Sequence, residues 1–328
     1  MSETESDADD AAVDAAPEWR RVVVDPTLHG QRLDKLLVGM APEFSRSHLQ
    51  GLIERGHVRL DDAVASSASR KVRFGQVVRL ELMPTAESLA FRAEAMPLDV
   101  VYEDEHLSVI NKPAGLVVHP AAGNWSGTLL NGLLAHHPAA ASLARAGIVH
   151  RLDKDTSGLM VVGRTQAAVT ALSRAIAARD VQREYLALAH GVLAAGSRRV
   201  EAPIGRDPAS RIRMAVVRGG RDAATEVDTV AVHDGISALR CRLHTGRTHQ
   251  IRVHLMHLGH PLIADAVYGG RPALGLLRQA LHAHRLGFDH PVTGAPMAFE
   301  CSPPADFAAA WRAVVDASLL GSRKTGPA

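Results

Sequence analysis

The stretch from Gly147 to Val162 constrains the fold more than any other part of the chain, because it places a dense cluster of charges between two short apolar runs. Ile148-Val149 leads into a charged loop, His150 to Asp155, and Ser157-Gly158 opens the second apolar run. Short apolar runs bounded by turn residues predict buried strands, so the charged loop should lie at the edge of a packed layer. Such loops often carry chemistry, although a lone Asp in a loop can also simply cap a turn.

A second polar stretch runs from Leu243 to Leu255. We expect a strand to end near Leu243, a turn at Thr245-Gly246 and a helix to begin near Thr248, whose side chain could be the N-cap. Helical spacing puts Arg252 and Thr248 on one face. The His and Arg side chains at this helix start could bind an anion, hold a carboxylate from another part of the chain, or be satisfied within the fold.

Several other chemistries lack the motif that they need. His254 and His257 are three residues apart and the chain has 18 His, but no HExxH motif or neighbouring carboxylate completes a metal site. Ser157 is not in a G-x-S-x-G motif, which argues against a serine hydrolase. No G-x-G-x-x-G or P-loop occurs, so nucleotide binding has no support. The sequence predicts no metal site.

Size and composition limit the class of protein. A chain of 328 residues, 46% of them hydrophobic, can form one large core and a small extra domain. Cys241 and Cys301 are far apart in sequence and cannot build a disulfide framework, which fits a reducing compartment. The N-terminus is acidic, unlike a secretory signal, and no apolar run approaches the length of a membrane span. We expect a cytoplasmic protein with no membrane partner.

The small net charge of +2 hides an asymmetry along the chain. Residues 1–18 hold seven acidic residues and no Lys or Arg, so the remainder has 37 basic against 28 acidic residues, a net charge of +9. Such an excess suggests a polyanionic partner. Of the basic residues 32 are Arg, which suits bidentate contacts to phosphate, but a GC-rich genome would also favour Arg. Both interpretations stay open.

The chain divides into five segments. We expect a disordered acidic tail at 1–18, a small domain at 19–83, a linker at 84–97, a large domain at 98–320 and a disordered tail at 321–328. The large domain is rich in strands with inserted helices, which predicts an α+β fold with a large mixed or mostly antiparallel sheet. The clearest elements are strands at 99–104, 107–110, 116–118 and 181–189, a hairpin turn at Asp234-Gly235, and helices at 128–136, 165–179 and 305–319.

The small domain has a recognisable pattern. A helix from Arg32, a second helix capped by Ser45 or Ser47 and ended near Gly56, and strands at 58–60 and 77–82 resemble the S4 RNA-binding domain, a small α/β unit. A solvated charged surface would be the simpler explanation of its charges. The resemblance implies RNA contacts from six residues: Arg32, Lys35, Arg46, Ser47, Arg55 and Lys71.

Three motifs occur in order along the large domain: His150 to Leu159, Arg183 to Ala187 and Gly246 to Arg252. Together they resemble the RluA/RluD family of pseudouridine synthases. With the S4-like domain in front, the chain is most similar to the RluD type, which acts on large-subunit (23S) ribosomal RNA. The resemblance covers roughly residues 20 to 320 and implies the catalytic fold of this family.

The resemblance also implies the roles of individual residues. Asp153 would be the catalytic carboxylate, Tyr185 would stack on the target base and take part in proton transfer, and Arg252 would pair with Asp153. Arg151 would lie near the flipped nucleotide. Further substrate contacts are expected from His150, Lys154, Arg247, His249 and Gln250. The family implies an isomerase that needs no metal or organic cofactor, acts on ribosomal RNA or a pre-ribosomal particle, and works as a monomer.

The implied chemistry is consistent with these residue types. Conversion of uridine to pseudouridine breaks the N1–C1′ bond, rotates the base and rejoins it through C5, and the base must first leave the helix. A carboxylate in an apolar pocket stays charged more readily beside an Arg. Two alternatives stay open: a tRNA-directed or dual-specificity synthase, and a non-catalytic ribosome-assembly factor that binds RNA.

Overall fold

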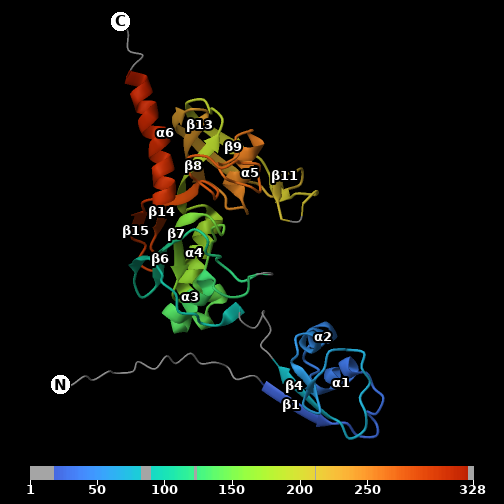
Figure 1. The fold of residues 1–328 in the computed structure, drawn as a ribbon. Coiled ribbons are helices and arrows are strands. Elements are labelled where there is room, and N and C mark those ends of the chain that lie inside the picture. Colours follow the sequence, from blue (N-terminus) through green and yellow to red (C-terminus); the bar gives the residue numbers. More distant parts are fainter. Residues whose placement is uncertain (1–17, 83–89, 122–123, 211, 324–328) are drawn as a thin grey trace, which may run out of the picture. The chain divides into compact units, whose positions relative to one another are not determined.

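The computed structural model describes residues 18–82, 90–121, 124–210 and 212–323, the side chains of 321–323 excepted (Figure 1). The chain forms two compact units, residues 1–88 (unit 1) and 89–328 (unit 2). The predicted acidic tail lies outside the described residues except for Glu18, and so do most of the predicted C-terminal tail and the first half of the predicted linker.

Unit 1 is a four-stranded antiparallel sheet, in the order β1-β4-β2-β3, with two helices. The second helix begins where predicted, because the Ser45 hydroxyl accepts a hydrogen bond from the His48 N–H (3.2 Å), and it stops before Gly56, which has a φ of +83°. The elements are β1 (Glu18–Val23), α1 (Leu33–Met40), α2 (Arg46–Glu54), β2 (Val58–Leu60), β3 (Ala63–Val64) and β4 (Val77–Leu82).

Unit 2 is built on a sheet in the order β5-β6-β7-β14-β8-β13-β12-β9, with β15 on the edge of β14. All neighbouring pairs are antiparallel except β7 and β14, so the predicted mixed, mostly antiparallel sheet is confirmed. Its strands are β5 (Val100–Glu103), β6 (Leu107–Lys112), β7 (Ser157–Gly163), β8 (Gln182–His190), β9 (Gly196–Glu201), β12 (Ala224–His233), β13 (Ile236–Leu243), β14 (Leu281–Asp289) and β15 (Pro296–Glu300). A separate hairpin pairs β10 (Ile204–Arg206) with β11 (Met214–Val216).

Helices cover both faces of this sheet. On one face α3 (Leu129–His136) and α5 (Gln250–His257) share an apolar cluster with sheet residues such as Met160 and Ala187, and on the other face α6 (Ala305–Arg323) shares one with Leu188 and Ala238. The helix α4 (Gln166–Ala178) covers β6 and β7 on the second face. Because β7 is buried along its whole length, the charged loop before it must lie at the edge of the packed layer, as its sequence predicts.

The structure corrects four local predictions. Residues 116–118 are not a strand, because the carbonyls of Val117 and Val118 accept the first N–H groups of α3 and are not free for a ladder. Ile148 makes only an isolated bridge to Val162. The helix α5 begins at Gln250, and His249, in the left-handed conformation (φ 57°), takes the N-cap position that we expected for Thr248. The last helix runs to Arg323, beyond its predicted end at Leu319.

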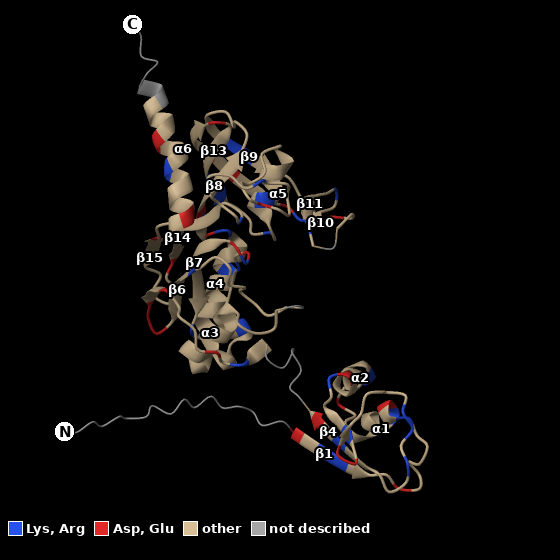
Figure 2. Ribbon diagram, in the orientation of Figure 1, with Lys and Arg blue, Asp and Glu red and all other residues tan. Residues whose placement is uncertain are grey.

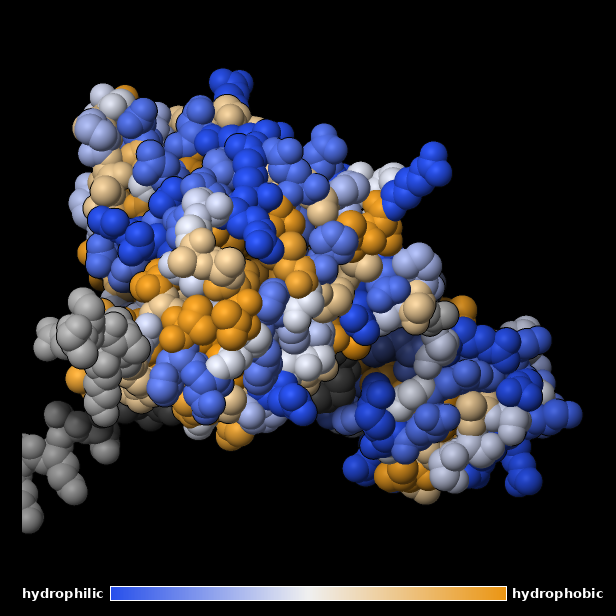
Figure 3. Space-filling view, turned by 90° about the horizontal axis from the view of Figure 1, so that it is seen from above, coloured by the Kyte–Doolittle hydropathy of each residue, from blue (hydrophilic) through white to orange (hydrophobic). Residues whose placement is uncertain are grey.

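The surface seen in Figure 3 is mainly hydrophilic, with hydrophobic side chains gathered in limited areas. Among the described residues, no helix has the length and apolar character that a membrane crossing requires.

Candidate active site

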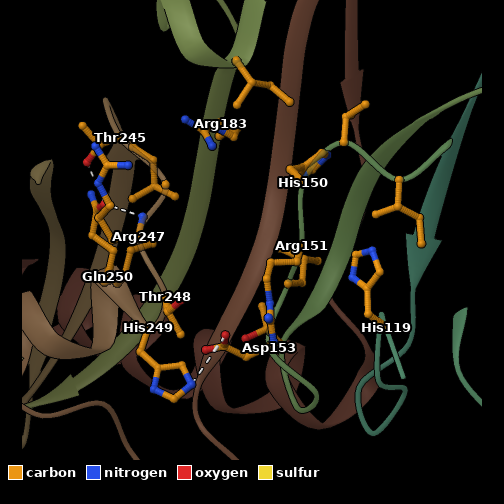
Figure 4. A pocket seen from close by; sticks show the side chains of 18 of the residues that line it. His119, His150, Arg151, Asp153, Arg183, Thr245, Arg247, Thr248, His249 and Gln250 are labelled. Atoms are coloured by element: carbon orange, nitrogen blue, oxygen red, sulfur yellow. Dashed lines mark hydrogen bonds and ion pairs between the residues drawn. The ribbon is translucent and has the colours of Figure 1, made fainter. Parts of the chain in front are cut away.

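A cavity of about 720 Å³ opens in unit 2 and is lined by two loops of the chain that are about 100 residues apart (Figure 4). One wall is the segment from Ile148 to Asp153, and the opposite wall runs from Leu243 to Arg252. The strand β8 forms its floor with Arg183 and Tyr185. The fold thus brings the three polar motifs of the sequence together at one site.

The loop that carries Asp153 is fixed by a buried lysine. Lys112, with no exposed surface, donates hydrogen bonds from Nζ to the carbonyls of Pro113 (2.7 Å), Leu116 (3.0 Å) and Lys154 (2.9 Å). Burial lowers the pKa of Lys112 to about 8. The Asp153 carbonyl also accepts from the Thr156 N–H (3.1 Å). The backbone carbonyls of Asp153 and Lys154 are therefore held in place.

Arg252, on α5, joins the two walls of the cavity. Its Nη1 donates to Asp153 Oδ2 (2.9 Å), while Nε and Nη2 donate to the two oxygens of Asp265 (2.7 and 2.9 Å). Its Cζ also lies 4.9 Å from the centre of the Tyr268 ring. Burial lowers the pKa of Arg252, but the carboxylates of Asp265 and Asp153 outweigh it and raise that pKa above its ordinary value. A charged, rigid donor therefore orients Asp153.

His249 lies on the other side of the same carboxylate, and Figure 4 shows the two side chains facing each other. Its Nε2 is 3.8 Å from Asp153 Oδ1, and its Nδ1 is 2.8 Å from the Tyr268 hydroxyl. That hydroxyl accepts the Met214 N–H (3.0 Å) and shares a second hydrogen bond with His249 Nδ1, whose direction is set by the tautomer of the ring. Burial lowers the pKa of His249, which favours the neutral form of the ring.

Tyr185 projects from β8 into the cavity. The residue is 6% exposed, and burial raises the pKa of its hydroxyl to about 12, so the phenol keeps its proton at neutral pH. The part of the chain that the structure describes offers this hydroxyl no hydrogen-bond partner.

The other predicted substrate-binding residues differ in whether they line the cavity and in how many of their polar atoms are already bonded within the protein. Arg151 and Arg247 line the cavity, Arg247 with its Nε bound to the Asp222 carbonyl (2.9 Å). His150 lines it too, but its Nε2 accepts the Val161 N–H (3.0 Å), and burial lowers its pKa to about 3. Lys154 is exposed and lies outside the cavity lining.

Gln250 lines the cavity but is occupied within the protein. Its Oε1 accepts from the Thr245 hydroxyl (2.6 Å) and the Arg247 N–H (3.0 Å), and its Nε2 donates to the Ala224 carbonyl (3.0 Å) and the Thr225 hydroxyl (2.9 Å). With all four of these bonds made, its amide fixes the loop and leaves little for a substrate.

Sequence reasoning assigned no role to four residues of this site: Lys112, Arg183, Asp265 and Tyr268. Asp265 is the one charged residue in an apolar stretch, and a buried carboxylate requires a partner. The sequence around it could therefore have indicated that Asp265 pairs with a cation. Lys112 stands at a turn between apolar runs, which gives no hint that it is buried. Among the described residues, no group of three or more His, Cys, Asp and Glu side chains could hold a metal ion.

Comparison with known proteins agrees with this geometry. The RNA pseudouridylate synthase family profile matches residues 106–257. The ribosomal large subunit pseudouridine synthase D of Neisseria meningitidis serogroup B is 46% identical over 317 residues, which cover 93% of this chain and 84% of that protein. The chain belongs to the pseudouridine synthase family. It is therefore an isomerase that acts on RNA.

Two further comparisons support the assignment to the pseudouridine synthase family. The protein of the same name from Nitrosomonas europaea is 46% identical over 301 residues, covering 89% of this chain and 87% of that one. The solved structure of human RNA pseudouridylate synthase domain containing 1 superposes with a TM-score of 0.53 at 25% identity, covering 70% of this chain and 96% of that one.

Residues 31–78 match the S4 domain, which confirms the predicted RNA-binding domain in unit 1. At its centre Asp34, with no exposed surface, accepts hydrogen bonds from Arg32 (3.1 and 3.0 Å), Arg46 (2.7 Å) and Gln50 (2.9 Å). This carboxylate orients both guanidinium groups. The other predicted RNA contacts, Lys35, Ser47, Arg55 and Lys71, are exposed, and Figure 2 shows basic residues at several places on unit 1.

Proposed function

We propose that this protein converts specific uridines of large-subunit ribosomal RNA to pseudouridine, with Asp153 as the catalytic carboxylate. The observation that carries the proposal is the pairing of Asp153 with Arg252 at the wall of a cavity that Tyr185 also lines. The choice of RNA rests on the relatives, which are named as large-subunit synthases and are 46% identical over most of their length.

In this proposal the flipped uridine occupies the cavity beside Asp153 and Tyr185. The N1–C1′ bond breaks, C1′ bonds to C5, the proton on C5 leaves, and N1 gains a proton, so no atom is lost and no redox partner is needed. Asp153 acts on the flipped nucleotide as nucleophile or base. The ring of Tyr185 stacks on the base, and its hydroxyl relays the proton from C5, giving up its own proton as it accepts that one.

Unit 1 would hold the RNA through its phosphates and its helical shape rather than through its base sequence. On this proposal the protein works as a monomer in the cytoplasm, where ribosomes are assembled.

Pseudouridine mapping of ribosomal and transfer RNA, from a strain that lacks the gene and from its parent, tests the proposal. We expect particular pseudouridines of the large-subunit RNA to disappear in the mutant and to return when the gene is restored. If only tRNA sites disappeared, the choice of substrate would be wrong. If no site changed, the chain would have another role in RNA binding.

A further inference from the structure

Arg183 is a buried cation with no anion beside it. The residue is 7% exposed and lines the cavity, yet the described residues offer its guanidinium neither a hydrogen bond nor an ion pair, and its Nε is out of reach of solvent. Leaving a buried charge without a partner destabilises a fold by several kcal/mol in general. A group of this kind in a binding cavity therefore indicates an anionic ligand.

The surroundings of Arg183 maintain this arrangement. The nearest carboxylate along the strand, Glu184, points the other way and pairs with Arg240 (3.3 Å) and Arg242 (3.4 Å). Gly246 faces the guanidinium so closely that a Cβ there would lie 2.8 Å from Arg183 Nη1. Because Gly246 has no side chain, the guanidinium of Arg183 can occupy this space.

The position of Arg183 relates it to the reacting nucleotide. It stands two residues before Tyr185 on β8, so both side chains project from the same face of the strand into the cavity. Figure 4 shows it between the loop that carries Arg247 and the segment that carries His150. Arg151 and Arg247 line the same cavity, so the field there attracts negative charge.

We propose that Arg183 binds a backbone phosphate of the RNA next to the uridine that enters the cavity. The inference rests on the function proposed above and adds to it a phosphate subsite. A guanidinium donates in a planar fork that matches two phosphate oxygens, and such charge-assisted bonds are among the strongest hydrogen bonds in proteins. The contact would fix the strand while the base turns toward Asp153.

The subsite can be tested with synthetic RNA hairpins. Each hairpin is centred on a uridine that pseudouridine mapping has identified as a target. In each hairpin one phosphate near that uridine is replaced by an uncharged methylphosphonate. For the wild-type protein we expect one replacement to raise KM about 10- to 100-fold, the loss typical of a charge-assisted hydrogen bond. The Arg183→Gln variant should show a similarly raised KM and should no longer respond to that replacement. If each methylphosphonate replacement raised the KM of Arg183→Gln by the same factor as it raises the KM of the wild type, the subsite would be refuted.

Two variants keep the test independent of folding defects. Gly246→Ala should displace only the flexible end of Arg183 and raise KM in the same way. Arg240→Gln, an exposed Arg on β13 outside the cavity lining, is the matched control and should leave KM unchanged. If Gly246→Ala and Arg183→Gln both bound the hairpin normally, the proposal would be wrong.

Binding of the hairpins is measured by fluorescence anisotropy as well as by turnover. A phosphate contact appears in this binding whether or not the uridine is isomerised, so loss of the subsite and failure of the proposed function give different results. If Arg183→Gln lowered kcat alone, with binding and the methylphosphonate response intact, the guanidinium would contact the base and the phosphate assignment would be overturned.

Discussion

Nη1 of Arg252 lies 2.9 Å from Oδ2 of Asp153, although the two residues are 99 positions apart in the chain. Nε and Nη2 of the same guanidinium donate to Asp265, and its Cζ lies over the ring of Tyr268. Arg252 therefore has one orientation, and through it the carboxylate of Asp153 has one as well. A carboxylate with a fixed orientation favours the reaction, because the nucleotide must bind in one geometry relative to it.

Replacing Arg252 by Lys should reduce kcat for pseudouridine formation about 100-fold or more. A lysine ammonium is a point charge and cannot bind Asp265 through two parallel bonds while it donates to Asp153. Single-turnover kinetics with large-subunit RNA transcripts would measure the loss, and thermal unfolding would show whether the variant is folded. Arg240→Lys serves as the exposed control. A folded Arg252→Lys protein of near-normal rate would remove Arg252 from the mechanism.

Replacing Tyr185 by Phe should lower kcat by about 100-fold, in the range of lost general acid–base catalysis, with a small effect on KM. The ring that stacks on the base is kept and only the hydroxyl is lost. Because the pKa of this hydroxyl is raised to about 12, its ionisation should not shape the pH–rate profile between pH 6 and 9. Tyr185→Leu should raise KM too, since it also removes the stacking ring. Equal kcat for wild type and Tyr185→Phe would exclude proton transfer by this residue.

The prediction for unit 1 concerns Lys35, Arg55 and Lys71, which are exposed. Changing all three to Gln should weaken RNA binding and reduce the slope of log K against log salt concentration by about 0.7 to 0.9 for each phosphate that these side chains neutralise. Filter binding at four salt concentrations gives the slope. Arg312→Gln, which changes an exposed residue of α6 outside the S4 domain, is the control and should leave the slope as it is. An unchanged slope in the triple variant would show that these three side chains do not contact phosphate.

His282, on β14, makes folding sensitive to pH. It has no exposed surface, and burial lowers its pKa to about 4, so the folded state holds it neutral while the unfolded chain binds a proton below about pH 6.5. Its stabilising contribution is therefore complete above pH 6.5 and is lost as the pH falls toward 4. From pH 7 to pH 5 we expect about 2 kcal/mol less free energy of unfolding from this group.

Urea unfolding at pH 7 and pH 5 measures this effect. In a Trp19→Phe background only Trp125 and Trp311 report, and both belong to unit 2. His282→Gln should lose less stability than the parent between the two pH values, whatever its stability at pH 7. The same loss in both proteins would mean that His282 does not titrate as described.

Much of the fold could be predicted because local signals agreed with the tertiary structure. The N-cap at Ser45, the turn at Asp234-Gly235 and the helix at 165–179 each depend on neighbouring residues alone. The strand predicted at residues 116–118 is wrong because its backbone conformation depends on residues outside that segment. The carbonyls of this segment serve Lys112 and the start of α3, which no sequence window of that length contains.

The candidate site divides in the same way. The three motifs identified Asp153, Tyr185 and Arg252 by resemblance, and the fold brings all three to one cavity. The partners Asp265 and Lys112 act through contacts across the fold, which spacing does not reveal. Gln250 shows the converse, since a polar residue beside the site can have its hydrogen bonds used within the protein.

The central claim is that Asp153 performs the chemistry and does not merely hold the site together. Asp153→Asn keeps the size of the side chain and removes its charge, and the measurement is pseudouridine yield alongside affinity for the same large-subunit RNA. We expect no detectable pseudouridine from the variant and an affinity within about threefold of wild type, since phosphate contacts dominate binding. Pseudouridine formed at a near-normal rate would contradict the claim, and so would a loss of binding as large as the loss of activity.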